Sequence, residues 1–219
     1  MQIELLTTNN SVVRGKINIL TMDDLSAVVT LQEYAKKTHY YQPCSNEILI
    51  NCLSNNLSIS VWIKNKLQAI LLIYNGTTQI AAGTKIYTDC KKDNVPLLCL
   101  AGVVVLPIIQ GNRLQYRLSM LSFSRAREAN YEHIFSVVHP NNTISMANMF
   151  LCGGVIKDYN HKCMGKPRFV YLFSLNSSTI SYNYSKLVNR SDFKKQKRLL
   201  EQGYVGRLFI KQQIVYSIG

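Results

Sequence analysis

A strand that runs directly into a turn and a helix is the feature that most constrains this fold. The run 97–106 is apolar and bounded by turn residues, which is typical of a strand buried inside a sheet. Pro107 cannot continue a central strand, and Gly111 tolerates the dihedral angles of a turn. Leucines at helical spacing follow from Leu114. We therefore expect a strand, a tight turn and a helix start in succession.

The start of such a helix favours an anion. Its first backbone N–H groups have no partner within the helix, and the helix dipole is positive at that end. The pattern outlines a phosphate-binding turn. An ordinary strand-to-helix connection gives the same pattern, and a lone Gly111 does not separate the two interpretations.

At these residues the chain resembles the GCN5-related N-acetyltransferases (GNATs), which move an acetyl group from acetyl-CoA to an amine. The start of the family's pyrophosphate loop, VxPxxR/QG, is matched by Val105, Pro107, Gln110 and Gly111. The next family positions are usually small, but here they are Arg113 and Gln115. The resemblance is therefore to a bacterial-type member with a divergent pyrophosphate loop.

Two later segments match the family in the same order. Asn142 and Ser145 stand at its NxxS/A spacing after a strand, and Gly153 stands at its helix-ending glycine. The run GKPR at 165–168 resembles a strand-associated motif of one bacterial subgroup. The resemblance covers roughly residues 17–175 and extends loosely into the tail.

The resemblance implies an α/β fold with a mixed, mostly antiparallel central sheet and helices on both faces. We expect an acetyl-CoA-binding domain over residues 1–175. Residues 176–219 would form a basic helix-strand extension that packs on the same domain. In the family, a strand edge binds the pantetheine arm, the turn after it binds the pyrophosphate, and the start of the facing helix, at Asn142 here, contacts the arm. The corresponding residues here are Val103, Val104, Val105, Gln110, Gly111, Asn112, Arg113, Leu114, Gln115, Asn142 and Ser145.

The residues that would carry out catalysis are less defined. Many members place a glutamate on the strand equivalent to 97–105, which has no carboxylate here. His139 and Glu132 are the titratable candidates for the base, and imidazole titrates near neutrality; a water chain to solvent is the alternative. Many members also carry an acidic tyrosine one turn before the helix-ending glycine, where this chain has Met149 and Phe150.

Tyrosines at three places in the chain are candidates for the catalytic acid or for the acceptor site. Tyr159 and Tyr171 could supply the acid in place of the missing family tyrosine. Tyr40 and Tyr41 lie between two expected helices, which in relatives form a wall of the acceptor site. A packed surface turn would explain the same tyrosine pair.

Cysteine content and hydropathy argue against a metal-binding, a secreted or a membrane-spanning protein. The six cysteines show no CxxC and no zinc-like spacing with histidine, so we expect no metal and a reduced, cytoplasmic protein. No apolar run reaches the ~18 residues of a membrane span, and the N-terminus lacks the pattern of a signal peptide. We therefore expect no membrane partner.

The net charge of +13 lies mostly in the second half of the chain. Residues 1–100 hold nine Lys/Arg and seven Asp/Glu, whereas residues 101–219 hold sixteen and five. This asymmetry fits the polyanion CoA, and it would also fit a nucleic acid or an acidic surface. Because the basic residues are not interleaved with a stacking motif, nucleic acid is not expected as a partner.

We therefore predict transfer of an acetyl group from acetyl-CoA to a primary amine, by direct attack in a ternary complex. The acceptor is a small molecule or a protein. The alternative is a non-catalytic CoA-binding or regulatory module with the same fold, and a nucleic-acid-binding protein ranks behind both. The oligomeric state is left open, with a homodimer as one arrangement.

The remaining pattern gives a coarse order of elements. Strand-like pieces at 2–6 and 17–20 flank a turn expected at Arg14-Gly15. Helices are expected after the caps Thr21 and Ser45, and again after Ser191 in the tail. The runs 57–64 and 67–74 predict a hairpin, and residues 75–95 predict an irregular loop.

Overall fold

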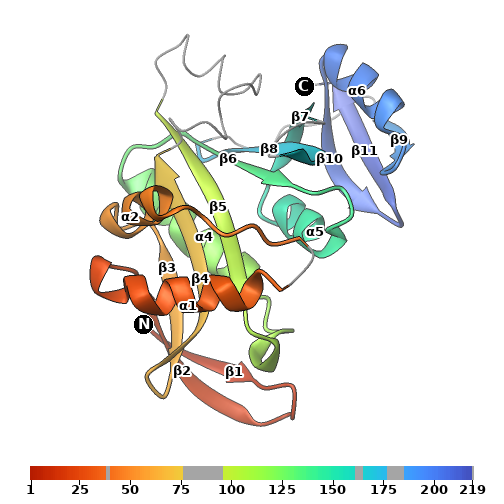
Figure 1. The fold of residues 1–219 in the computed structure, drawn as a ribbon. Helices are drawn as coiled ribbons and strands as arrows, with labels where there is room; N and C mark the ends of the chain where they lie inside the picture. The colour runs from red at the N-terminus through yellow and green to blue at the C-terminus, as the bar shows by residue number, and fades with distance from the viewer. Residues whose placement is uncertain (38–39, 76–95, 161–164, 177–184, 219) are drawn as a thin grey trace. The chain divides into compact units, whose positions relative to one another are not determined.

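The computed structural model describes residues 1–37, 40–75, 96–160, 165–176 and 185–218 (Figure 1). The chain divides into two compact units. The first unit consists of Met1–Asn75 and Leu100–Ala129, and the second of Gly76–Cys99 and Asn130–Gly219. The expected loop at 75–95 lies outside the described residues apart from Asn75. The proposed domain bounds, 1–175 and 176–219, stay a prediction.

The first unit contains a twisted run of strands with its hydrophobic core on β4. The strands are β1 (Gln2–Leu6), β2 (Val12–Ile19), β3 (Ile59–Ile63), β4 (Lys66–Asn75) and the end of β5 (Leu97–Val105), in that order across the sheet. The pairs β1–β2, β2–β3 and β3–β4 are antiparallel. Residues 69–74 of β4 are fully buried. Such a run is typical of a strand covered on both faces.

Helices cover this part of the sheet, with α1 drawn in front of the strands and α4 behind them in Figure 1. The helical elements are η1 (Met22–Asp24), α1 (Leu25–Ala35), α2 (Asn46–Ser54), η2 (Pro107–Ile109) and α4 (Leu114–Glu128). Thr21 forms a capping box with Asp24, and Ser45 accepts a hydrogen bond from the Ile48 N–H at 3.4 Å. Both caps were expected from the sequence.

The second unit contains the other strands. They are the start of β5, β6 (His133–Val138), β7 (Val155–Asn160), β8 (Arg168–Ser174), β9 (Ser185–Asn189), β10 (Tyr204–Ile210) and β11 (Gln213–Ile218). Their order is β5-β6-β8-β7-β10-β11-β9. The start of β5 pairs with β6 in parallel, as a strand–helix–strand connection requires. The β6–β8, β8–β7, β7–β10, β10–β11 and β11–β9 pairs are antiparallel.

Among the residues that the structure describes in this unit, two helices occur, α5 (Thr143–Leu151) and α6 (Phe193–Glu201). The N-cap of α5 is Asn142. The helix is followed by Gly153, whose φ of +83° is the left-handed conformation that commonly follows a helix end. α6 begins at Asp192, whose side chain accepts a hydrogen bond from the Lys195 N–H. The expected cap Ser191 is therefore wrong by one residue.

Another sequence-based boundary is also wrong. The turn between β1 and β2 lies at Thr7–Ser11, closed by Thr7 N–H to Ser11 O at 2.9 Å, and Gly15 lies inside β2. A Cβ on Gly15 would lie 3.1 Å from the Trp62 carbonyl oxygen, so close packing explains this glycine. The expected hairpin is confirmed as β3–β4, with its turn at Lys64 and Asn65 (φ +48° and +59°).

The expected fold class is confirmed. The sheet is mixed and mostly antiparallel, its one described parallel pair is β5–β6, and helices accompany the strands in both units. None of the described helices combines the length and apolar character that a membrane span needs.

Candidate functional site

The expected phosphate-binding turn lies exposed between β5 and α4. Pro107 begins the short helix η2, and Gly111 (φ +87°) and Arg113 (φ +52°) take left-handed conformations before Leu114 begins α4. Gly111 and Arg113 are exposed, and no atom lies within 4 Å of the position that a Cβ on Gly111 would take. The turn is therefore open to solvent and to an anion.

The backbone of this turn keeps donors free. In the described part of the chain, the N–H groups of Gly111, Asn112, Arg113 and Leu114 make no hydrogen bond. Arg113 caps α4 without a side-chain hydrogen bond to the helix. Free N–H groups at a helix N-terminus are the donors that phosphate groups use in proteins.

Hydrogen bonds to the β1–β2 hairpin hold the turn in place. The Asn112 amide donates to Leu6 O at 2.7 Å and to Ile109 O at 2.9 Å, and its oxygen accepts from the Leu6 N–H at 2.9 Å. The Thr8 N–H donates to Ile108 O at 2.9 Å. The Asn112 side chain is therefore engaged in fixing the turn, and its backbone N–H is the group available to a ligand.

Gln110 has a similar structural contact. Its amide nitrogen donates to the Val105 carbonyl oxygen at 3.1 Å, which closes the turn over the end of β5. Of the neighbouring strand residues, Val104 is buried while Val103 and Val105 are half-buried. The structure thus brings the end of β5, Gln110 and Arg113 into one continuous segment, as expected from the sequence.

Tyr41 lies against β5, and its hydroxyl is hydrogen-bonded to Gln32 of α1. Its hydroxyl donates to Gln32 Oε1 at 2.8 Å, and the same oxygen accepts from the Cys44 N–H at 2.9 Å. A Cβ on Gly102 would lie 3.2 Å from the Tyr41 ring, so Gly102 makes room for the tyrosine. Burial raises the pKa of the Tyr41 hydroxyl. Tyr40 is 42% exposed, so the expected tyrosine pair is split between a packed and an exposed residue.

The Asn142–Ser145 spacing has a local structural explanation. Asn142 is the N-cap of α5, and its side-chain oxygen accepts from the Ser145 N–H at 3.1 Å. This is the N-cap-to-N3 bond that the spacing predicts for a helix start. The role of both residues in binding stays a prediction.

His139 accepts a hydrogen bond at Nδ1, and its role as a base stays a prediction. Its Nδ1 accepts from the Asn141 N–H at 3.0 Å. A neutral imidazole that accepts at Nδ1 carries its hydrogen on Nε2. Protonation at Nδ1 would break the bond to Asn141. This geometry favours His139 as an N–H donor.

The two candidate bases do not lie together. Glu132 precedes β6 and His139 follows it, and seven residue steps of strand span ~23 Å. Glu132 is exposed, and its carbonyl oxygen accepts from the Leu175 N–H at 2.8 Å. They cannot form an acid–base pair in this structure.

The candidate acids are packed. Tyr171 is fully buried, its hydroxyl has no hydrogen-bond partner in the described residues, and burial raises its pKa well above the usual range. Its ring contacts Phe150 edge-on at 5.2 Å. Tyr159 stacks on Phe193, with ring centroids 5.1 Å apart, and burial also raises its pKa. The buried Tyr171 therefore presents no hydroxyl to a ligand, whereas the role of the half-buried Tyr159 stays a prediction.

Arg190 is a residue that sequence reasoning missed. Its Nη1 donates to Pro140 O at 3.1 Å and to Asn141 Oδ1 at 2.8 Å, so it holds the turn that carries His139. Nothing in the local sequence marks this role, because the partners are 49 or 50 residues away. No group of three or more metal-ligating side chains occurs among the described residues.

Comparisons with known proteins match the chain through its structure. No family model matches the sequence, and no curated protein is significantly similar to it. An acetyltransferase of the GNAT family from Streptococcus pneumoniae superposes with a TM-score of 0.54 at 13% identity, over 73% of this chain and 98% of the other. The chain has the GNAT fold.

Other matched structures have the same fold. A polyamine N-acetyltransferase of Drosophila melanogaster, which forms N-acetylagmatine, gives a TM-score of 0.57 at 12% identity, over 73% of this chain and 99% of that one. The ribosomal-protein-S18-alanine N-acetyltransferase of Escherichia coli gives 0.52 at 12% identity, over 78% and 99%. Nearly the full length of these proteins is thus represented, which supports the GNAT resemblance found in the sequence.

Proposed function

We propose that this chain is an N-acetyltransferase that binds acetyl-CoA at the β5–α4 turn and transfers the acetyl group to a primary amine. The observation that carries the proposal is the row of four free N–H groups from Gly111 to Leu114, on an exposed turn of a GNAT fold. The sequence resemblance places the pyrophosphate loop at these same residues.

The turn fits a diphosphate in charge as well as in hydrogen bonding. Arg113 and Arg117 are both exposed, at the cap and in the first turn of α4. A guanidinium donates charge-assisted hydrogen bonds to phosphate oxygens. Because Asn112 fixes the loop to β1, the donors are held in place before a ligand arrives, which reduces the entropy cost of binding.

In the proposed reaction the neutral amine attacks the thioester carbonyl carbon directly. The resulting tetrahedral intermediate expels the CoA thiolate, and the amine loses a proton as the amide forms. The chain's own contribution is placement of the donor through Val103–Leu114, with the Tyr41 ring lying beside Gly102 of β5. No described carboxylate lies on β5, so the neutral amine would come from solution or through a water chain.

Acceptors in the matched structures are amines of two kinds. The Drosophila protein forms N-acetylagmatine, and the Escherichia coli protein acts on an alanine of ribosomal protein S18. We infer only the shared class, an amine on a small molecule or a protein. Tyr40, which is exposed, and Tyr41 remain the proposed acceptor-side residues.

The second candidate function is a protein with the same fold that does not catalyse acetyl transfer. Met149 is 2% exposed at the position near which many relatives have the acid tyrosine, and Tyr171 is fully buried. Neither Met149 nor the buried Tyr171 therefore offers an exposed hydroxyl that could protonate the thiolate. A CoA-binding or regulatory module would have this property.

Calorimetry and thiol release together separate the two candidates. Titration with acetyl-CoA and with CoA tests binding. Release of free CoA thiol with agmatine, spermidine and an N-terminal alanine peptide then tests turnover. Binding with release supports the enzyme, and binding without release across the amine panel supports the module. The absence of binding at millimolar ligand would overturn both.

A further inference from the structure

A group of basic side chains gathers around α6 in the second unit. We call this group the α6 patch and define it as Lys186, Lys194, Lys195 and Arg198, all of which are exposed. Lys186 comes from β9, and the others come from α6. Lys186 pairs across the sheet with Tyr216, whose hydroxyl reaches Gln196 on α6, so Lys186 lies on the face of the sheet that carries α6.

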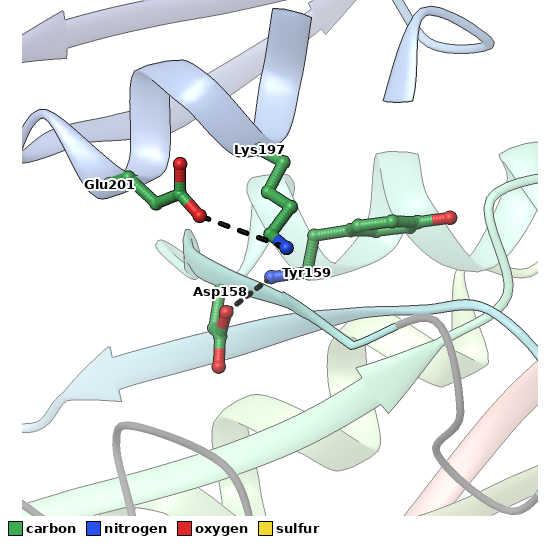
Figure 2. Close-up of polar contacts among 4 residues, drawn as sticks. All are labelled: Asp158, Tyr159, Lys197 and Glu201. Atoms are coloured by element: carbon green, nitrogen blue, oxygen red, sulfur yellow. Dashed lines mark hydrogen bonds and ion pairs between the residues drawn. The ribbon is translucent and has the colours of Figure 1, made fainter. Parts of the chain in front are cut away.

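The α6 patch has no acidic counterpart among the described residues. Among the described residues, the ion pair on α6 joins Lys197 and Glu201 at 3.8 Å, and Figure 2 shows this pair beside Asp158 and Tyr159 of β7. The Asp192 carboxylate caps the helix through the Lys195 N–H at 3.1 Å. The nearby carboxylates are therefore engaged in other contacts, and no described acidic side chain neutralises the charge of the patch.

The position of two of these cations works against the stability of the helix, whereas Arg198 stands in the last turn, where the dipole favours a cation. Lys194 and Lys195 stand in the first turn of α6, where the helix dipole is already positive. Lys194 and Arg198 are four residues apart, a spacing at which like charges repel. A helix selected for stability alone would carry acidic residues here, so the arrangement indicates a binding role.

The opposite side of α6 is held firmly. Gln196, Leu199 and Leu200 are buried. The Gln196 amide donates to Asn189 O at 3.1 Å and to Arg190 O at 2.7 Å, and its oxygen accepts from the Tyr216 hydroxyl at 2.7 Å. The patch is thus presented outward by a helix fixed at its buried face.

We propose that the α6 patch binds the phosphate backbone of duplex nucleic acid without sequence preference. Duplex DNA carries one charge per ~1.7 Å of helix axis, a density that a compact cluster of point charges matches. Three of the four cations are lysines, which act as point charges and lack the planar fork that reads bases or carboxylates in pairs. An extended acidic peptide has a lower charge density on one face.

The neighbouring aromatic rings favour duplex over single strands. Phe193 stacks on Tyr159 at 5.1 Å, and Lys186 Nζ lies 4.4 Å from the centre of the Tyr204 ring. These rings are engaged within the protein, whereas single-strand binding uses exposed rings on which bases stack. The missing stacking motif, from which the sequence predicts no nucleic acid partner, therefore argues only against single strands.

The test measures binding of the full chain to a fluorescently labelled 20-base-pair DNA of arbitrary sequence between 50 and 250 mM KCl. We expect log affinity to fall with log salt with a slope of about −3.6, since each of four neutralised phosphates contributes about −0.9. The triple variant Lys194→Gln, Lys195→Gln, Arg198→Gln is expected to lose at least tenfold in affinity at 100 mM salt and most of that slope.

A matched control carries Lys16→Gln, Lys37→Gln and Lys66→Gln. These lysines are exposed, lie in the first unit and change the net charge by the same amount. The proposal predicts affinity close to that of the unchanged chain. An equal loss in both triples would mean that only net charge matters, and would overturn the α6 patch as the site.

Competition decides the class of partner. Unlabelled duplex is expected to displace the label at lower concentration, per charge, than poly-glutamate or single-stranded DNA does. Stronger displacement by poly-glutamate would assign the patch to an acidic protein, and stronger displacement by single strands would also overturn the proposal. Thermal unfolding checks that both triples are folded. Acetyl-CoA titration of each variant keeps this result separate from the proposed transferase activity.

Discussion

Arg190 is joined to Asn141 by a hydrogen bond of 2.8 Å that spans 49 residues of sequence. The same nitrogen of Arg190 donates to Pro140 O at 3.1 Å, and the Asn141 N–H donates to His139 Nδ1 at 3.0 Å. Arg190 is itself held through its carbonyl oxygen, which accepts from Gln196 at 2.7 Å. The segment before α6 therefore fixes the turn that sets the hydrogen-bonded state of His139.

Replacement of Arg190 should loosen this turn. We expect Arg190→Ala to lower the free energy of unfolding by about 1–2 kcal/mol, because charge-assisted hydrogen bonds in a partly buried site are lost. Nitrogen NMR of His139 should show the Nε2–H tautomer in the unchanged protein and a mixture of tautomers in Arg190→Ala. The control Arg207→Ala removes a bond to Ser217 Oγ in the same unit and should leave His139 unchanged. A mixed tautomer in the unchanged protein would contradict this assignment.

Arg113 combines a strained backbone with a charge at the proposed phosphate site. Its φ of +52° is a conformation that glycine and asparagine adopt more readily than arginine. We expect Arg113→Gly and Arg113→Asn each to weaken acetyl-CoA binding about tenfold through loss of the guanidinium, with unfolding free energies within about 1 kcal/mol of the unchanged chain. Calorimetry and urea denaturation check this. Tighter binding in Arg113→Gly would show instead that the side chain obstructs the turn.

Two adjacent glycines after α5 should respond differently to alanine. A Cβ on Gly154 would lie 2.5 Å from Phe173 Cε1 and 2.9 Å from the Met149 carbonyl oxygen, which is backbone and cannot move aside easily. A Cβ on Gly153 would meet no atom within 4 Å, so alanine there is disfavoured only by the backbone φ of +83°. We expect Gly154→Ala to cost about 2–4 kcal/mol and Gly153→Ala about 1 kcal/mol in urea denaturation. Equal costs would mean that Phe173 and the chain at Met149 repack freely.

Tyr171 and Tyr216 provide a pair of substitutions with opposite expected signs. Tyr171→Phe removes a buried hydroxyl that has no partner in the described residues, so we expect stabilisation of about 1 kcal/mol. Tyr216→Phe removes the donor to Gln196 and leaves that buried oxygen without it, so we expect a loss of about 1–2 kcal/mol. Thermal and urea unfolding give both values. A loss in Tyr171→Phe would indicate that its hydroxyl has a partner.

Stability should fall in alkaline solution. Burial raises the pKa of Tyr41, Tyr171 and Tyr216 in the folded state. Above the unfolded pKa of about 10, the unfolded chain loses these protons while the folded chain keeps them. The free energy of unfolding is therefore unchanged by these groups below about pH 10, and above it declines by up to about 1.4 kcal/mol per pH unit per tyrosine. Urea denaturation from pH 8 to 11 measures this, and Tyr171→Phe should reduce the slope.

Local sequence was enough to define the organising segment. The apolar run 97–106 became β5, Pro107 began η2, and the leucine spacing gave α4, because these signals are read from residues close together in the chain. Caps at Thr21 and Ser45 were correct for the same reason. β7 was missed because its residues 157–160 are polar and half-buried, which gives no apolar run.

The sequence by itself determined the strand 97–106, the turn and the helix start that follow it, since each depends on neighbouring residues, and the family resemblance supplied the fold class. Only the tertiary structure decided what the polar side chains do. Asn112 binds β1 across 106 residues, the half-buried Tyr41 donates its hydroxyl hydrogen to Gln32, and Arg190 holds Asn141. Such contacts join residues distant in the chain, and their energies depend on burial and geometry that arise only when the chain has folded.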